Sequence, residues 1–368
     1  MTADSGLENL TDFDVVAVDI DRRLRTVRSI LECKSGRGQA KEPDRLLWLA
    51  GLRDYVGVPR AALVRSTITE RGRAMARRLR IETTDIRQIE NRELAIAWLP
   101  GNFAHVGGYE CGLAEKAADE QAKSLGYLSP SSMNFLKHEA LFASSPSTLR
   151  ALSDLRENLD GEAPLPTPLD IVVGGHALVA LILAATEDAH RLDYSSRSAL
   201  EARIERAVTV GDGNVLQVLT QADAYVEHVV EQVHEGYERA GIARIETPVE
   251  GLREIVQERP AWLPRYLDFI EALRSNVSVA CELAQTAELS VFEGLVGGKA
   301  HLFTAFDHLF TAEHRQMLRL AVLTLEEIGG PATTAGLRDL AAKASFDRVP
   351  SEVPDRRGDP TPSTLRHI

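Results

Sequence analysis

Residues 12–36 read "DFDVVAVDIDRRLRTVRSILECKSG", and the predicted fold depends on this segment. It contains two runs of apolar and β-branched residues, Asp14–Asp19 and Thr26–Lys34, separated by the charged segment "IDRRLR". This pattern predicts an antiparallel β-hairpin with a charged tip. If Asp19 pairs with Val27, the same register places Asp14 opposite Glu32.

This register brings chemical groups together at one end of the hairpin. Residues directly opposite each other share a face, as do residues two apart, so Asp14, Glu32 and Lys34 are expected to form one cluster. A slip of one residue would send Asp14 to the other face. Two neighbouring carboxylates repel each other unless a cation lies between them. Carboxylates suit Mg²⁺, and the ammonium of Lys34 could orient an attacking water or stabilise developing charge.

The next elements alternate between helix and strand. "EPDRLLWLAGLRDYVG" predicts a helix that ends at Gly57, and Arg60–Thr67 predicts a short buried strand. A second helix is expected in "ITERGRAMARRLR", with Thr69 as its N-cap, followed by a last strand in "IETTDI". The order β-β-α-β-α-β is typical of an α/β domain with a mixed sheet.

The residues "DFDVVAV…RSILECKSG…DRLLWLAGLRDYVGVPRAALVRST" resemble the PD-(D/E)xK, or restriction-endonuclease-like, nuclease superfamily. In that superfamily an acidic residue opens one strand, Glu-x-Lys closes the next, and a helix and a further strand follow. The resemblance covers residues 10–90. It implies Mg²⁺- or Mn²⁺-dependent hydrolysis of phosphodiester bonds.

The resemblance also implies site roles. Asp14, Glu32 and Lys34 would be the catalytic residues. Asp14, Glu32 and the backbone carbonyl of Cys33 would hold the metal. The loop after the motif would contact substrate through Arg37, Gln39 and Lys41. The superfamily usually has a helix with another acidic ligand before the first active-site strand. Here Glu8, or another segment or chain, would have to supply that ligand, and Asp12 is a further auxiliary candidate.

From Glu90 onward the pattern is helical. Helices are expected at Leu113–Leu125, Thr148–Leu159, Val215–Ala240, Leu263–Leu283 and His314–Ile328. The predicted fold class is therefore α/β plus all-α: a nuclease-like mixed-sheet domain over 1–92 and a helical regulatory or interaction domain over 93–346. A subdivision is considered at the linker-like segment 160–168, and the Pro-rich segment 347–368 predicts a disordered tail.

Charge divides the chain in the same way. Residues 1–100 hold 18 Lys and Arg against 15 Asp and Glu, and the rest of the chain holds 24 against 39. We therefore expect nucleic acid, DNA in preference to RNA, at the N-terminal part. We expect a protein partner or self-association through the acidic helical part. The three scattered cysteines suit a reducing cytoplasm. The apolar run Ile171–Thr186 is short for a bilayer span, so we expect a buried core helix and no membrane partner.

Other motifs favour structural roles. Two Glu-x-x-His pairs, Glu187/His190 and Glu231/His234, have the spacing used in di-iron bundles, but the second pair lies off the apolar stripe of its helix. Cys281 lies in a helical stretch and is expected in the core. The favoured function is a metal-dependent nuclease with a helical regulatory domain, placed by analogy in bacterial defence or repair. The alternative is a non-catalytic interaction or scaffold protein with a degenerate, nucleic-acid-binding nuclease-like domain.

Overall fold

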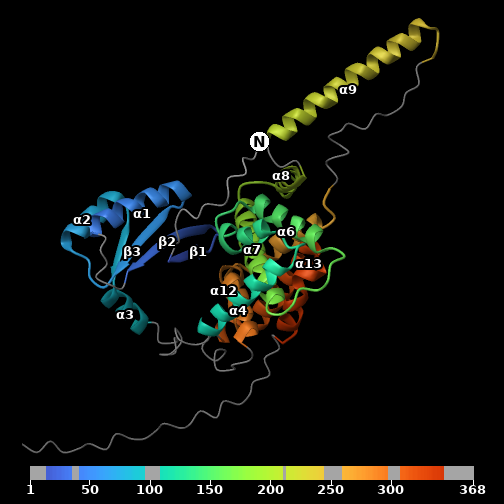
Figure 1. Cartoon of the computed structure of the whole chain (residues 1–368). Helices are drawn as coiled ribbons and strands as arrows, with labels where there is room; N and C mark the ends of the chain where they lie inside the picture. The colour runs from blue at the N-terminus through green and yellow to red at the C-terminus, as the bar shows by residue number, and fades with distance from the viewer. Residues whose placement is uncertain are drawn as a thin grey trace, which may run out of the picture.

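The computed structural model describes residues 14–34, 41–95, 108–209, 213–243, 259–296 and 307–343. They form a small α/β part at the N-terminal end and a larger helical body (Figure 1). One long helix, α9 (Gly213–Arg239), projects away from the helical body. The predicted order, a mixed sheet followed by a helical region, is confirmed.

The sheet has four strands in the order β1-β2-β3-β4. The first pair is antiparallel and the other two pairs are parallel, which makes the sheet mixed. The strands are β1 (Val15–Ile20), β2 (Thr26–Lys34), β3 (Arg60–Arg65) and β4 (Glu82–Asp85). The helices of this part are α1 (Glu42–Val56), α2 (Glu70–Leu79) and α3 (Ile86–Ala95).

The hairpin register is the predicted one. Asp19 pairs with Val27, and the ladder continues to Val15 opposite Leu31. Asp14 immediately precedes β1, so it lies at the end of the sheet where β2 finishes.

The helix ends follow local chemistry. α1 stops because Gly57 adopts φ 73, a left-handed conformation that costs glycine little, and its N–H donates to the carbonyl of Arg53. α2 begins after Thr69, whose hydroxyl accepts the N–H of Gly72 at 2.9 Å.

The helices α1 and α2 pack together over one face of the sheet and bury a small core. Its members are Ile30, Leu46, Leu49, Val58, Ala61, Leu63, Ala76 and Ile81.

The helical body has its own, larger core around α7. Its helices are α4 (Gly108–Ser124), α5 (Pro130–Asn134), α6 (Ser145–Leu159), α7 (Leu169–Arg191), α8 (Arg197–Thr209), α11 (Leu263–Ser275), α12 (Val277–Val296) and α13 (Ala312–Lys343). Within the described ranges, α7 is the one helix long and apolar enough to cross a membrane, but 78% of its apolar window is buried inside the protein. The prediction of a buried core helix is therefore confirmed.

Two glycines let neighbouring helices approach α7 closely. A Cβ atom on Gly174 would lie 2.7 Å from the carbonyl oxygen of Thr333 in α13. A Cβ atom on Gly175 would lie 2.6 Å from Cγ1 of Val291 in α12. Larger residues at either position would force these helices apart.

One predicted helix is wrong in its extent. The segment Leu263–Leu283 was expected to form a single helix, but α11 ends at Ser275 and α12 begins at Val277. Asn276 between them has φ −136 and ψ 69, which is not helical. Its side-chain oxygen accepts the hydroxyl of Ser278 at 3.1 Å, so asparagine acts locally as a break and a new start.

The segment 160–168 connects α6 to α7, and both helices contribute to the same core. Residues 347–368, predicted as a disordered tail, lie outside the described residues.

The hairpin tip is more than the charged turn expected from its sequence. Leu24 is 2% exposed and belongs to the core of the helical body. Its backbone has φ 59, which is unusual for leucine. Asp21 holds this turn, because one of its carboxylate oxygens accepts the N–H groups of Arg23 and Arg25 at 2.9 and 3.0 Å. The thiol of Cys281 in α12 donates to the carbonyl of Asp21 at 3.2 Å and is partly buried against the same core, as expected for Cys281.

Candidate functional site

The predicted site lies at the edge of the sheet where β1 begins and β2 ends. Because β1 runs antiparallel to β2, these two strand ends meet at the same edge. The ammonium nitrogen of Lys34 lies 2.9 Å from Oε1 of Glu32 and 3.4 Å from Oδ2 of Asp14. Oδ2 of Asp14 also accepts the backbone N–H of Cys33 at 2.7 Å. The fold therefore brings Asp14, Glu32 and Lys34 together.

Glu32 is the buried member of this cluster, at 4% exposure. It lies on the face that α1 covers, since its neighbour Leu63 in β3 is fully buried in the small core. Arg45 of α1 places Nη1 3.5 Å from Oε1 of Glu32. Lys34 and Arg45 therefore place two positive charges beside this buried oxygen. Burying a carboxylate is costly even when it is paired, and such groups cluster at functional sites.

The electrostatics of the cluster favour the charged forms of Asp14 and Lys34. Burial alone would raise the pKa of Asp14, but the N–H of Cys33 and the ammonium of Lys34 outweigh it and lower that pKa. The close carboxylate of Glu32 is the main cause that raises the pKa of Lys34, and Asp14 adds to it. Burial, followed by the two carboxylates, raises the pKa of the Cys33 thiol. The thiol is therefore a poor nucleophile at neutral pH.

The donor set fits a hard divalent cation. Since Oε1 of Glu32 and Oδ2 of Asp14 both contact one nitrogen, they lie no more than the sum of the two distances, about 6 Å, apart. Two ligands of one Mg²⁺ lie about 3 to 4 Å apart, because each Mg–O distance is about 2 Å. The separation that the structure allows therefore includes the one that a shared Mg²⁺ needs. Within the described part of the chain, no three His, Cys, Asp or Glu side chains form a metal-binding group, so the hairpin offers two carboxylates. Mg²⁺ often takes only one or two, with water and phosphate oxygens as the rest.

The other predicted site residues are placed only in part. Cys33 contributes its backbone N–H to Asp14, and its side chain is exposed. Lys41 is exposed immediately before α1. The remaining predicted residues lie outside the described residues: Glu8, Asp12, Arg37 and Gln39.

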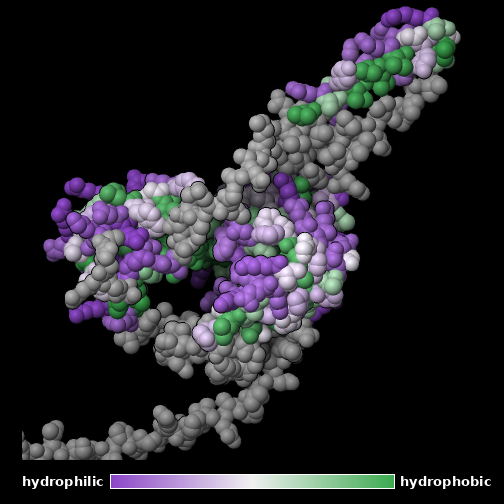
Figure 2. Space-filling model, viewed as in Figure 1, coloured by the Kyte–Doolittle hydropathy of each residue, from purple (hydrophilic) through white to green (hydrophobic). Residues whose placement is uncertain are grey.

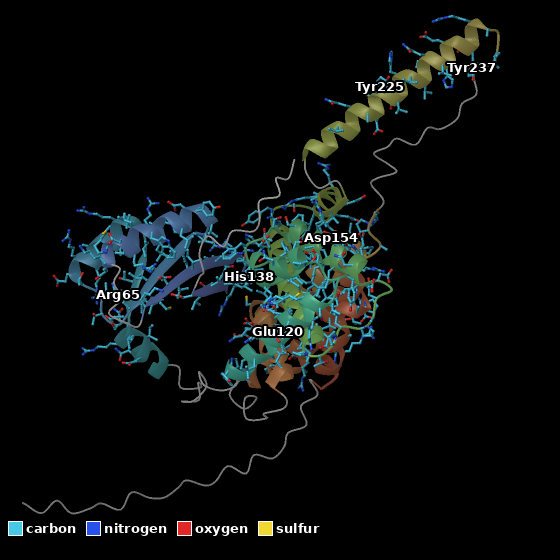
Figure 3. The ribbon with its side chains drawn as sticks, viewed as in Figure 1. Arg65, Glu120, His138, Asp154, Tyr225 and Tyr237 are labelled. Atoms are coloured by element: carbon cyan, nitrogen blue, oxygen red, sulfur yellow. The ribbon has the colours of Figure 1, made fainter. Side chains whose placement is uncertain are left out.

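Two arginines at this edge were not predicted as site residues. Arg45 contacts Glu32, and Arg65 ends β3 directly beside Lys34 in the parallel ladder (Figure 3). The parallel order of β2 and β3 is the signal that could have identified Arg65, since the C-terminal ends of parallel strands meet at one edge. The position of Arg45 depends on how α1 packs on the sheet, which local patterns do not reveal.

The Glu187/His190 pair anchors the hairpin to the helical body. Glu187 accepts the guanidinium of Arg191 at 2.5 Å and lies 3.7 Å from the guanidinium of Arg28 in β2. Nδ1 of His190 lies 2.8 Å from the carbonyl oxygen of Arg23 at the hairpin tip. Both side chains therefore connect the hairpin that bears the candidate site to the helical body. Glu231 and His234 lie on the projecting helix α9, away from both cores.

Comparisons with known proteins identify no relative of this chain. No protein-family model matches the chain, and no curated protein and no solved structure matches it. The resemblance to the PD-(D/E)xK superfamily is an expectation from the sequence that these comparisons do not test.

Proposed function

We propose that this protein is a divalent-metal-dependent nuclease that hydrolyses phosphodiester bonds, of DNA in preference to RNA. The observation that supports it most directly is the position of Glu32. Its carboxylate is buried and shares the Lys34 ammonium with Asp14 at the edge of the sheet. A buried ion pair adds little net stability, because the cost of desolvating both charges offsets their attraction, and this favours a functional reason for the cluster.

Each residue would have a distinct task. Asp14, Glu32 and the carbonyl of Cys33 would hold Mg²⁺ or Mn²⁺. When bound, the ion would lower the pKa of a water and neutralise charge on the phosphodiester. Lys34 would orient the water or stabilise the charge that develops on the phosphate.

The surroundings suit a phosphate backbone. Arg45 and Arg65 lie at the same edge of the sheet, and an arginine guanidinium binds phosphate through a planar set of donors. Arg37, Gln39 and Lys41 are the substrate contacts expected from the sequence, and they would add further donors for phosphate. The strongly acidic remainder of the chain would repel phosphate, so we assign that region to binding a protein partner or to self-association. For the whole protein we propose a cytoplasmic role in bacterial defence or repair.

Plasmid nicking with the full chain tests this proposal. We expect nicking of supercoiled DNA in Mg²⁺ or Mn²⁺ that is abolished by a chelator and falls at least about 100-fold in Glu32→Gln and in Lys34→Ala. Asp19→Ala is the matched control, because this exposed carboxylate lies on the same hairpin but pairs with Arg60 at 3.5 Å. Equal nicking by the wild type and both site variants would refute the assignment. Calorimetric titration with Mn²⁺ should show binding that Glu32→Gln loses.

One observation favours the non-catalytic alternative. Two cations, Lys34 and Arg45, contact Glu32, so the cluster is charge-balanced without a metal. In that case the wild type would bind DNA but would neither nick it nor bind Mn²⁺. Glu32→Gln would then lower the free energy of unfolding without affecting any activity.

A further inference from the structure

Helix α9 presents an apolar stripe to solvent. The helix has 27 residues and is about 40 Å long. It projects from the helical body, and none of its residues belongs to either hydrophobic core of the described part of the chain (Figure 1). The stripe runs along the helix in Figure 2, and Figure 3 labels its two tyrosines. Its most exposed members are Val218 (62%), Tyr225 (69%), Val229 (39%), Val233 (48%) and Tyr237 (48%).

The spacing of small and apolar residues along α9 is that of a coiled coil. Steps of four and three residues alternate without interruption through Val215, Leu219, Ala222, Val226, Val229, Val233 and Gly236. The mean step is therefore about 3.5 residues, which keeps one seam facing a partner helix as the two supercoil. A helix that only covers a globular core needs no such regularity.

The positions beside this seam carry almost no charge. They are Val218, Tyr225 and Gln232 on one side and Asp223, Val230 and Tyr237 on the other. The glutamates of α9 lie on the opposite face, at Glu227, Glu231, Glu235 and Glu238. Two such helices can therefore bring their seams together while both acidic faces stay in water.

We propose that α9 pairs with α9 of a second copy of this chain in a two-stranded coiled coil. The sequence of the seam is self-complementary, because apolar positions meet apolar positions whichever copy supplies them. Val226 and Val233 occupy the seam positions at which parallel dimers prefer β-branched residues. The acidic outer face disfavours an anionic membrane or a nucleic acid as the occupant.

The size of the stripe sets the expected strength. A stripe about 40 Å long and about 10 Å wide covers roughly 400 Å² per copy. A standard stable interface buries about 800 Å² per partner. Pairing through α9 is therefore reversible and depends on protein concentration. It also gives α9 the packing of its apolar face, which is where most helical stability in proteins comes from. This inference does not depend on the nuclease proposal.

Analytical ultracentrifugation of the full chain over a concentration series tests it. The wild type should pass from monomer to dimer, and the double variant Val226→Glu/Val233→Glu should raise the dissociation constant at least about tenfold. The double variant Gln221→Glu/Ala224→Glu is the matched control, because it adds the same two charges to the exposed face opposite the seam and should leave the dimer intact. α9 lies outside both cores, so the far-UV circular dichroism of the helical body should survive in all variants.

Three results would overturn the inference: a wild type that stays monomeric throughout, a double variant that associates as the wild type does, or a control that dissociates equally. If a monomeric wild type instead captured a different protein through α9, the occupant would be that partner and not a second copy.

Discussion

Replacing Leu24 should destabilise the helical body, although Leu24 lies in the β-hairpin. Its side chain is 2% exposed and packs in the core of that body. Truncation of a buried leucine to alanine removes the burial energy and leaves a cavity, for a typical cost of about 3 kcal/mol. Leu24→Ala should therefore lower the free energy of unfolding by about that amount. Urea denaturation followed by far-UV circular dichroism, which reports mainly the helices, measures it.

A glycine variant separates side-chain burial from backbone conformation. Leu24→Gly loses one further carbon group, at about 0.8 kcal/mol. It also relieves the left-handed backbone at φ 59, which costs an L-residue about 1 kcal/mol. The two effects nearly cancel, so Leu24→Gly should also cost about 3 kcal/mol.

Arg22→Ala provides the control, because Arg22 is an exposed residue of the same turn. It should change stability by less than about 0.5 kcal/mol. If Leu24→Ala cost under about 1 kcal/mol, or if Leu24→Gly stabilised the protein, the tip would not be docked in the helical core and the reasoning would be wrong.

The remaining predictions concern the helical body and α1. Burial raises the pKa of Asp188, whose carboxylate accepts the hydroxyl of Tyr266 at 3.0 Å, so the folded state holds the proton more tightly than the unfolded state. The free energy of unfolding of the wild type should therefore fall as the pH rises from 3.8, the ordinary pKa of aspartate, through the raised pKa of Asp188. Urea titrations at several pH values measure this fall, and the Asp188→Asn variant should not show it. Gly174→Ala should destabilise by about 1 to 3 kcal/mol in thermal or urea unfolding, because its Cβ would meet a backbone carbonyl at 2.7 Å. Gly51→Ala, an exposed position in α1 with no atom within 4 Å of the added Cβ, should instead stabilise by about 0.5 to 1 kcal/mol, and a loss there would contradict the helix assignment.

Local sequence determined the α/β part in detail. Alternating β-branched residues, Gly57 after α1 and Thr69 before α2 are signals that act within a few residues, so the strands, the two helices and the hairpin register followed from them. The proximity of Asp14 to Glu32 followed in turn, because side chains alternate across a strand with a period of two. A break at Asn276 was missed, since apolar periodicity continues across it while the backbone of that one residue leaves the helical region at φ −136 and ψ 69.

Only the tertiary structure decided which charges and surfaces meet. The sequence could not show that Glu32 would be buried beneath α1 with Arg45 beside it, because that depends on how a helix packs on a sheet. It also could not show that Leu24 would enter a core built from residues far along the chain. Periodicity predicts that α9 is an amphipathic helix, but whether its stripe faces the protein or the solvent is set by packing between distant segments. Local patterns determine backbone conformation and side-chain direction. Burial and long-range contacts depend on how segments distant in the sequence pack against one another in the folded chain.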